Sequence, residues 1–215
     1  MEINHNETDI DTLRRQIILH YYEVEGGSVT TDNPDDLGGA TGNGGMTQML
    51  MDEYKHLWDK HGFNGDVMGG IPYPLIEEVC THRFWDRMWL NEIARYSPYL
   101  ADTMYGWALN SGTGTVIKLL QMHLNGMNRK ATLYPELNVD GGMGNNTFDA
   151  FEAYFNTRIK DHPMDKLLEV MLSGQTYHYC RITHERKSQN NDTFYGGWLN
   201  RIINKRSRLI KNITQ

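Results

Sequence analysis

Apolar residues recur every three or four positions over most of this 215-residue chain. That spacing gathers them on one face of an α-helix, because the helix turns once every 3.6 residues. The pattern is clearest in residues 10–25, where Asp9 or Asp11 can cap the start of the helix. Gly26 and Gly27 should end it, since glycine readily takes the left-handed conformation that closes a helix.

The rest of the chain repeats this pattern between glycine-rich loops. Residues 46–60 return to helical spacing, and Pro74 can open another helix at its first turn. Further helical segments are expected at 74–90, 97–111, 112–127, 146–159, 162–187 and 192–210. A short strand-like stretch at 29–31 can form a small β-hairpin, and no other strand pair is convincing. The sequence therefore predicts a mostly α fold with a small β-hairpin or loop.

Length and composition are those of a globular protein. The chain is 39% hydrophobic and 22% charged, and no run approaches the roughly 18 apolar residues of a membrane helix. Its N-terminus lacks a basic region followed by an apolar core. We therefore expect synthesis in the cytoplasm without a signal peptide. Cys80 and Cys180 form no metal-binding pair, and we expect free thiols and a monomeric chain.

Charge is divided unevenly along the chain. Residues 181–215 carry eight Lys or Arg and two acids, a balance of +6, while the first 180 residues have a balance of −12. The last fifteen residues contain five bases and no acid. This tail predicts contact with an anionic wall or membrane surface, or a solvated terminal helix whose bases favour the negative end of its dipole. The acidic body argues against nucleic-acid binding.

An acidic, glycine-rich loop follows the first helix, from about Glu23 to Gln48. Glycosidic bond cleavage needs a protonated carboxylic acid on one side of the bond and a carboxylate on the other. Glu25 suits the acid, because the C-terminus of a helix and neighbouring aromatic residues disfavour a negative charge. Asp36, Asp35 and Asp32 are candidates for the second carboxylate, and Thr41 could orient a water molecule.

The glycines of this loop have two explanations. Gly26, Gly27, Gly38 and Gly39 would allow the backbone to approach an extended sugar chain closely, which makes them candidate substrate-binding residues. Alternatively, Asp and Asn next to Pro and Gly simply make turns.

The loop also resembles the opening motif of glycoside hydrolase family 108, in which E-G-G is followed by an Asn/Asp/Pro stretch, D-P-G-G-A-T and G-I-T. Residues 81–88 (THRFWDRM) are similar to a later aromatic segment of that family, matching best at Arg83, Phe84, Trp85 and Asp86. Residues 97–121 resemble a third family segment. Residues 138–151 and 194–202 are similar to elements of its associated peptidoglycan-binding module. The resemblance covers about residues 11–205, with its parts in the expected order.

The resemblance implies a lysozyme-like N-acetylmuramidase without metal or cofactor, which acts on peptidoglycan glycan strands of the cell wall after release. It implies a catalytic region at 1–97, a helical peptidoglycan-binding-like region at 98–215, and Glu25 as proton donor. Arg83 and Trp85 become candidate substrate-binding residues. Trp85 could stack on a sugar face, although a tryptophan at helical spacing also suits a core.

The loop departs from the family pattern in length. It is about two residues longer between Glu25 and Gly38 and one longer between Thr41 and Thr47. The choice between Asp32, Asp35 and Asp36 therefore stays open.

Three other activities fit parts of the sequence. A lytic transglycosylase would need the acid but no water-activating group, and a catalytically silent wall-binding or secretion-accessory protein would need neither. A zinc amidase would require metal ligands. His178, Cys180 and His184 come nearest, but the sequence contains no zinc-binding motif such as HExxH.

Overall fold

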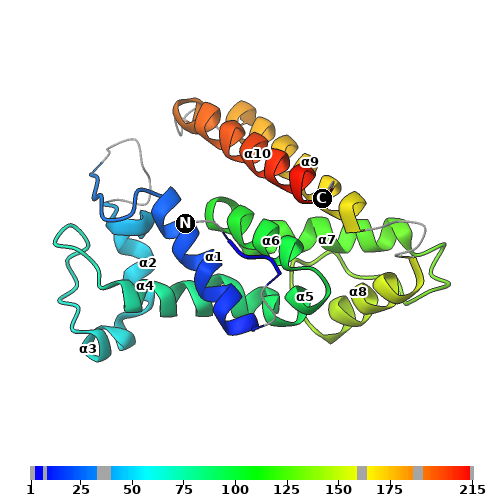
Figure 1. The fold of residues 1–215 in the computed structure, drawn as a ribbon, viewed down its shortest axis with the longest axis horizontal. Helices are drawn as coiled ribbons and strands as arrows, with labels where there is room; N and C mark the ends of the chain where they lie inside the picture. The colour runs from blue at the N-terminus through cyan, green and yellow to red at the C-terminus, as the bar shows by residue number, and fades with distance from the viewer. Residues whose placement is uncertain (1–2, 7–8, 33–39, 159–163, 186–190, 214–215) are drawn as a thin grey trace. The chain divides into compact units, whose positions relative to one another are not determined.

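The structure is a computed structural model that describes residues 3–6, 9–32, 40–158, 164–185 and 191–213 (Figure 1). It divides into two compact units, Met1–Asp86 and Arg87–Gln215. The regular structure is almost entirely helical, with isolated antiparallel bridges between Thr31 and Thr41 and between Thr41 and Thr47. The mostly α fold with a small β element is confirmed. The boundary expected between 97 and 98 falls inside the second unit and stays a prediction.

The first unit consists of short helices joined by turns. They are α1 (Ile10–Val24), α2 (Gln48–Glu53), α3 (Trp58–His61) and α4 (Tyr73–Cys80), with 3-10 turns at Asn43–Gly45 and Lys55–Leu57 and a π-helical turn at Thr81–Trp85. The helical pattern at 46–60 is thus split into α2, a turn and α3. The backbone leaves the helical region at Tyr54, where φ is −110° and ψ is 23°.

Helix α1 forms where the sequence predicts it. The Asp9 carboxylate accepts a hydrogen bond from the Asp11 N–H and caps the helix. The inner face of α1 packs against α4 and is buried, with Leu13, Ile17, Ile18 and Tyr21. At the other end the Gly27 N–H donates to the Tyr22 carbonyl (2.9 Å), and Gly26 and Gly27 have φ of 102° and 56°. The glycine-terminated helix is therefore confirmed.

The second unit contains longer helices around a buried centre. They are α5 (Leu90–Tyr96), α6 (Pro98–Ser111), α7 (Thr113–Met127), α8 (Asn145–Arg158), α9 (Met164–Glu185) and α10 (Asn191–Ile213). Helix α6 is buried from Leu100 to Ala108 and packs against α5, α7 and α9. The helix expected over 74–90 ends earlier, because Trp89 takes a left-handed conformation (φ 50°) before α5 begins. Among the described helices, none has the length and apolar character to cross a membrane.

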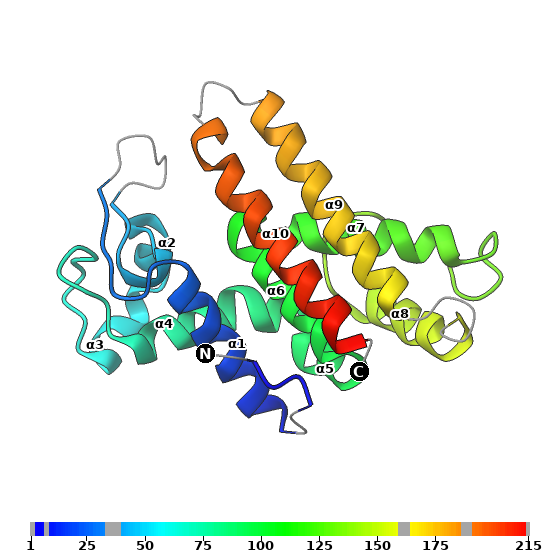
Figure 2. The same ribbon diagram turned by 45° about the horizontal axis from the view of Figure 1, so that its top comes forward.

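Helices α9 and α10 lie side by side and run in opposite directions (Figures 1 and 2). Lys205 of α10 is buried, and its Nζ donates to the Asp102 carboxylate and to the Asp102 carbonyl, both at 2.9 Å. Arg206 pairs with Glu169 at 2.8 Å. Two bases of the C-terminal tail therefore serve packing within this unit. Contact of the tail with an anionic surface remains a prediction that rests on its other bases.

Candidate active site

Glu25 stands at the C-terminal end of α1. Its backbone N–H donates to the Tyr21 carbonyl (2.9 Å), and its side chain is partly exposed. Glu25 therefore stands at the C-terminal end of a helix, which is the negative end of the helix dipole. After Glu25 the two left-handed glycines turn the chain sharply away from the helix axis.

The segment around Thr41 is fixed by backbone hydrogen bonds. The N–H of Thr31 donates to the carbonyl of Thr41 and the N–H of Thr41 donates to that of Thr31, both at 2.8 Å. The Gly42 N–H donates to the Met46 carbonyl (2.8 Å), and the Gln48 N–H donates to the Ala40 carbonyl (3.0 Å). Thr41 is partly exposed and forms antiparallel bridges with both Thr31 and Thr47, so it lies between two short bridged segments.

The turn Asn43–Gly45 contacts the end of α1. The Gly44 N–H donates to the Gly27 carbonyl at 2.7 Å. A Cβ on Gly44 would lie only 2.5 Å from Cδ2 of Tyr22, and one on Gly45 would lie 3.3 Å from Cβ of Glu25. Both glycines have positive φ, 68° and 74°. Gly45 is exposed and close to the Glu25 side chain, which any larger residue at position 45 would crowd.

Asn43 is a buried residue of this site that sequence reasoning missed. Its Nδ2 donates to the Ile71 carbonyl (2.8 Å), and its Oδ1 accepts from the Ile71 N–H (2.7 Å). Nδ2 also lies 3.4 Å from the Tyr22 hydroxyl, and only 8% of the residue is exposed. In the sequence, Asn43 is the single residue with a side-chain amide within Gly42–Gly45, in a span that is one residue longer than in the family pattern. That signal alone does not distinguish a buried bridge from a turn.

The other candidate carboxylates and glycines are placed in part. Asp32 is exposed, directly after the bridge residue Thr31. Asp35, Asp36, Gly38 and Gly39 lie outside the described residues. The choice of the second carboxylate therefore stays a prediction, as do the roles of these two glycines.

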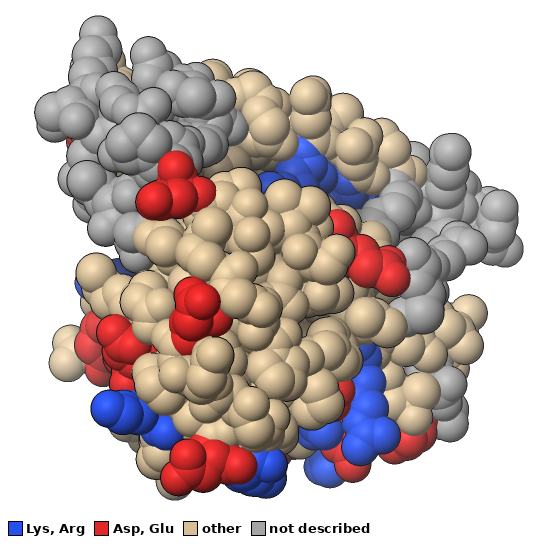
Figure 3. All heavy atoms as spheres, turned by 90° about the vertical axis from the view of Figure 1, so that its left-hand side faces the viewer, with Lys and Arg blue, Asp and Glu red and all other residues tan. Residues whose placement is uncertain are grey.

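Charge on the face drawn in Figure 3 is mixed. Acidic and basic side chains lie scattered there around an area of uncharged residues. This distribution suits recognition through hydrogen bonds and close contact better than attraction of a strongly charged ligand to that face.

Arg83 and Trp85 both lie in the π-helical turn Thr81–Trp85 but differ in exposure. Arg83 is partly exposed, and its Nη1 donates to Oε2 of Glu53 at 2.7 Å, which joins the π-helical turn to α2. Trp85 is 0% exposed. A side chain without exposed surface offers no face to a sugar, so the structure supports the packing alternative for Trp85. Arg83 stays a candidate for substrate contact.

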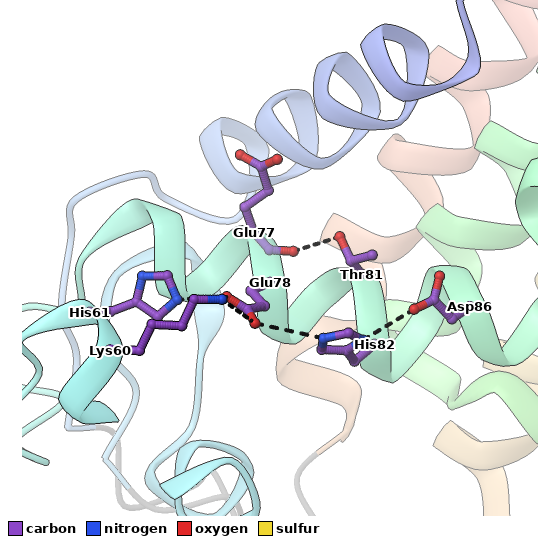
Figure 4. A network of polar contacts seen from close by, with 7 residues as sticks. All are labelled: Lys60, His61, Glu77, Glu78, Thr81, His82 and Asp86. Carbon is purple, nitrogen blue, oxygen red and sulfur yellow. Dashed lines mark hydrogen bonds and ion pairs between the residues drawn. The ribbon is translucent and has the colours of Figure 1, made fainter. Parts of the chain in front are cut away.

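A polar network joins α3 to α4 (Figure 4). Glu78 accepts from Nζ of Lys60 (2.7 Å) and contacts Nε2 of His61 (2.6 Å). His82 lies 3.8 Å from Glu78 and 3.1 Å from Asp86. The hydrogen bonds from Lys60 and His61 hold the pKa of Glu78 below its ordinary value. The network holds α3 and α4 together with charges that depend on pH.

Asp140, in the segment 138–151 of the second unit, makes hydrogen bonds that fix the chain locally. Asp140 accepts hydrogen bonds from Nε2 of Gln121 (2.9 Å) and from the Gly142 N–H (2.7 Å). These bonds lower the pKa of Asp140. Gln121 is buried on α7 and also donates to Thr147 at the start of α8 (3.1 Å). The motif therefore fixes the loop between α7 and α8.

Two of the residues that came nearest to a zinc site, His178 and Cys180, make contacts with aromatic side chains. Sγ of Cys180 lies 2.7 Å from the Tyr195 hydroxyl, and the His178 ring packs near Trp107. Within the described residues, no three His, Cys, Asp or Glu side chains gather as metal ligands.

Two family models match this chain. Residues 18–112 match the family model described as Glycosyl hydrolase 108. This stretch belongs to glycoside hydrolase family 108. Residues 115–203 match a second model, described as Predicted Peptidoglycan domain. The two matches together support a peptidoglycan hydrolase with a peptidoglycan-binding module.

The fold has a counterpart among solved structures. The chain is similar to the structure of Brucella abortus SagA, with a TM-score of 0.66 and 18% sequence identity, over 94% of this chain and 95% of that chain. At that identity the likeness establishes a shared helical fold alone. No match was found among curated proteins.

Proposed function

We propose that this glycoside hydrolase 108 protein is an N-acetylmuramidase that hydrolyses the β-1,4 bond between N-acetylmuramic acid and N-acetylglucosamine. The observation that carries the proposal is the placement of Glu25. It is the C-terminal cap residue of α1 and is partly exposed, and its Cβ and Cγ would lie 3.3 and 3.8 Å from a Cβ on Gly45. Gly45 is exposed and has no side chain, which leaves room for a polymer to approach Glu25.

Glu25 is the general acid in this mechanism. It donates its proton to the glycosidic oxygen as the bond breaks, and the sugar on the other side develops positive charge. The first step requires Glu25 in its neutral, protonated form. Gly26 and Gly27 turn the chain away immediately after Glu25 and leave room for the sugar beside it.

A loop aspartate and Thr41 supply the second half of the reaction. Asp36, or Asp35 or Asp32 in its place, orients the attacking water or stabilises the positive charge, and the Thr41 hydroxyl helps to hold the water. The hydrogen bonds between Thr31 and Thr41 support this role, because they fix the backbone on which Thr41 is carried. The second unit keeps the enzyme on the glycan strands.

The products formed from purified sacculi test this proposal. A muramidase releases new reducing ends on N-acetylmuramic acid, and mass spectrometry identifies them. A lytic transglycosylase gives 1,6-anhydro ends instead, and it tolerates Asn at Asp32, Asp35 and Asp36 while Glu25→Gln is inactive. Release of free amino groups, abolished by a chelator, would establish an amidase. Binding to sacculi without any product would establish a silent wall-binding protein.

The basic tail gives a separate, weaker contact with the anionic wall. Arg208 and Lys211 are the bases chosen to test it, because Lys205 and Arg206 already make packing contacts within the second unit. Replacing both with Ala should weaken binding to sacculi at low salt and change it little at high salt, since salt screens exposed charges. Equal affinity of parent and variant at low salt would remove the tail from the proposal.

A further inference from the structure

We propose that Asn43 is a positioning residue for Glu25. Its hydrogen bonds to Ile71 fix the position of the Asn43–Gly45 turn, which is close to the Glu25 side chain. This inference rests on the proposed function, because it assigns Asn43 a part in the same reaction. It concerns a span that is one residue longer here than in the family pattern.

The contacts of Asn43 are those of a fixed bridge. Its amide pairs with both backbone groups of Ile71, as one strand residue pairs with another, at 2.7 and 2.8 Å. Burial of an amide without partners is unfavourable, so these bonds select a single orientation of the side chain. The long contact with the Tyr22 hydroxyl adds a link to α1.

The turn is held between two parts of the first unit. On one side, a Cβ on Gly42 would lie 2.8 Å from both Cδ1 of Ile71 and the Val67 carbonyl oxygen, so segment 67–71 lies directly against it. On the other side, Gly44 packs on the Tyr22 ring and bonds to the Gly27 carbonyl. The turn therefore has little freedom to move as long as Asn43 keeps its bonds to Ile71.

The position of the turn reaches the catalytic group through proximity. A Cβ on Gly45 would lie 3.3 Å from Cβ of Glu25, so a shift of the turn changes the space that the Glu25 side chain can occupy. A reacting group displaced by about 1 Å can slow catalysis about 100-fold. Loss of the Asn43 bridge should therefore reduce turnover more than it reduces substrate binding, which is spread over many sugars.

The test compares Asn43→Ala with Asn64→Ala in the full chain. Asn64 is a matched control from the same unit, because it is exposed and its Oδ1 accepts a local bond from the Asp66 N–H (3.0 Å). For each variant, thermal unfolding gives the folded fraction, and hydrolysis of soluble glycan chains gives kcat and KM. The titration of the Glu25 carboxyl carbon is followed by NMR and assigned with Glu25→Gln.

The proposal predicts a fall in kcat of about 10- to 100-fold for Asn43→Ala, with KM near that of the parent and a shifted Glu25 titration. Asn64→Ala should match the parent in all three. If folded Asn43→Ala keeps both the parent kcat and the parent Glu25 titration, Asn43 is only structural and the proposal is overturned.

A second variant covers the case in which Asn43→Ala does not fold. Asn43→Asp retains an acceptor for the Ile71 N–H but loses the donor to the Ile71 carbonyl, and it should show a smaller fall in kcat with a shifted Glu25 titration. Parent-like values would again overturn the proposal. A parent without hydrolytic activity would refute the proposed function, whereas the NMR comparison would still report whether Asn43 positions Glu25.

Discussion

The two units hold their important loops by different means. Around Glu25, in Met1–Asp86, backbone groups make most of the contacts, and the glycines of the Asn43–Gly45 turn are packed where a Cβ would collide. In Arg87–Gln215, side chains of long helices reach another helix or a loop, as Lys205 does to Asp102 and Gln121 does to Asp140. Small steric changes should therefore disturb the first unit, while loss of a buried polar partner should disturb the second.

The largest effect is expected from Lys205 in the second unit. Lys205→Ala removes the cation that contacts the buried Asp102 carboxylate, and this should lower the free energy of unfolding by about 3–5 kcal/mol. Denaturant unfolding followed by circular dichroism measures the change. The double variant Lys205→Met with Asp102→Leu should recover much of the loss, because no charge then stays buried without a partner. A single variant as stable as the parent would contradict the role given to this pair.

A matched glycine pair tests the first unit. Gly44 and Gly62 have nearly the same φ, 68° and 66°, but a Cβ would meet the Tyr22 ring at Gly44 and nothing within 4 Å at Gly62. Gly44→Ala should therefore lower the free energy of unfolding by about 1–3 kcal/mol more than Gly62→Ala, which isolates crowding from backbone strain. Equal losses in thermal unfolding would show that the turn is not tightly packed on α1.

A substitution to glycine should have the opposite sign in the second unit. Arg129, Lys130 and Ala131 all have positive φ, between 48° and 60°, which is costly for residues with a Cβ. Lys130→Gly relieves this strain and should raise the free energy of unfolding by about 1 kcal/mol. Lys118→Gly, within α7, should lower it by a similar amount. A destabilised Lys130→Gly variant would contradict the left-handed turn.

The smallest effect concerns pH. The pKa of Glu78 is lowered in the folded chain by its bonds to Lys60 and His61, so its stabilising contribution is complete above its unfolded pKa near 4.5 and is lost as pH falls through the lower folded value. Thermal unfolding of Glu78→Gln should therefore depend less steeply on pH than that of the parent below about pH 4.5. Parallel pH profiles would exclude a role for this network in acid sensitivity.

The sequence predicted what periodicity and glycine chemistry determine. Helical spacing defined α1, and the Gly26–Gly27 pair correctly marked its end, because both are local properties of the chain. Local patterns did not predict the break at Trp89, where the left-handed conformation follows from no turn residue in the sequence.

Tertiary contacts explain the other differences. Asn43 and Ile71 are 28 residues apart, so their pairing depends on how two loops pack. Lys205 lies in a tail whose composition suggested solvent or an anionic partner, yet it is buried against a residue 103 positions away. Burial of a charge at such separation is decided by the packing of whole helices, which composition does not reveal.

The rate of release of reducing ends from purified sacculi tests the central claim most directly, with Glu25→Gln compared with Glu23→Gln. Glu23 is an exposed acid two residues earlier on α1 and provides a control of the same chemistry. Glu25→Gln should lower the rate by about 100- to 10,000-fold through loss of the proton donor, while Glu23→Gln stays near the parent. Substantial activity in folded Glu25→Gln would contradict the assignment of the catalytic acid.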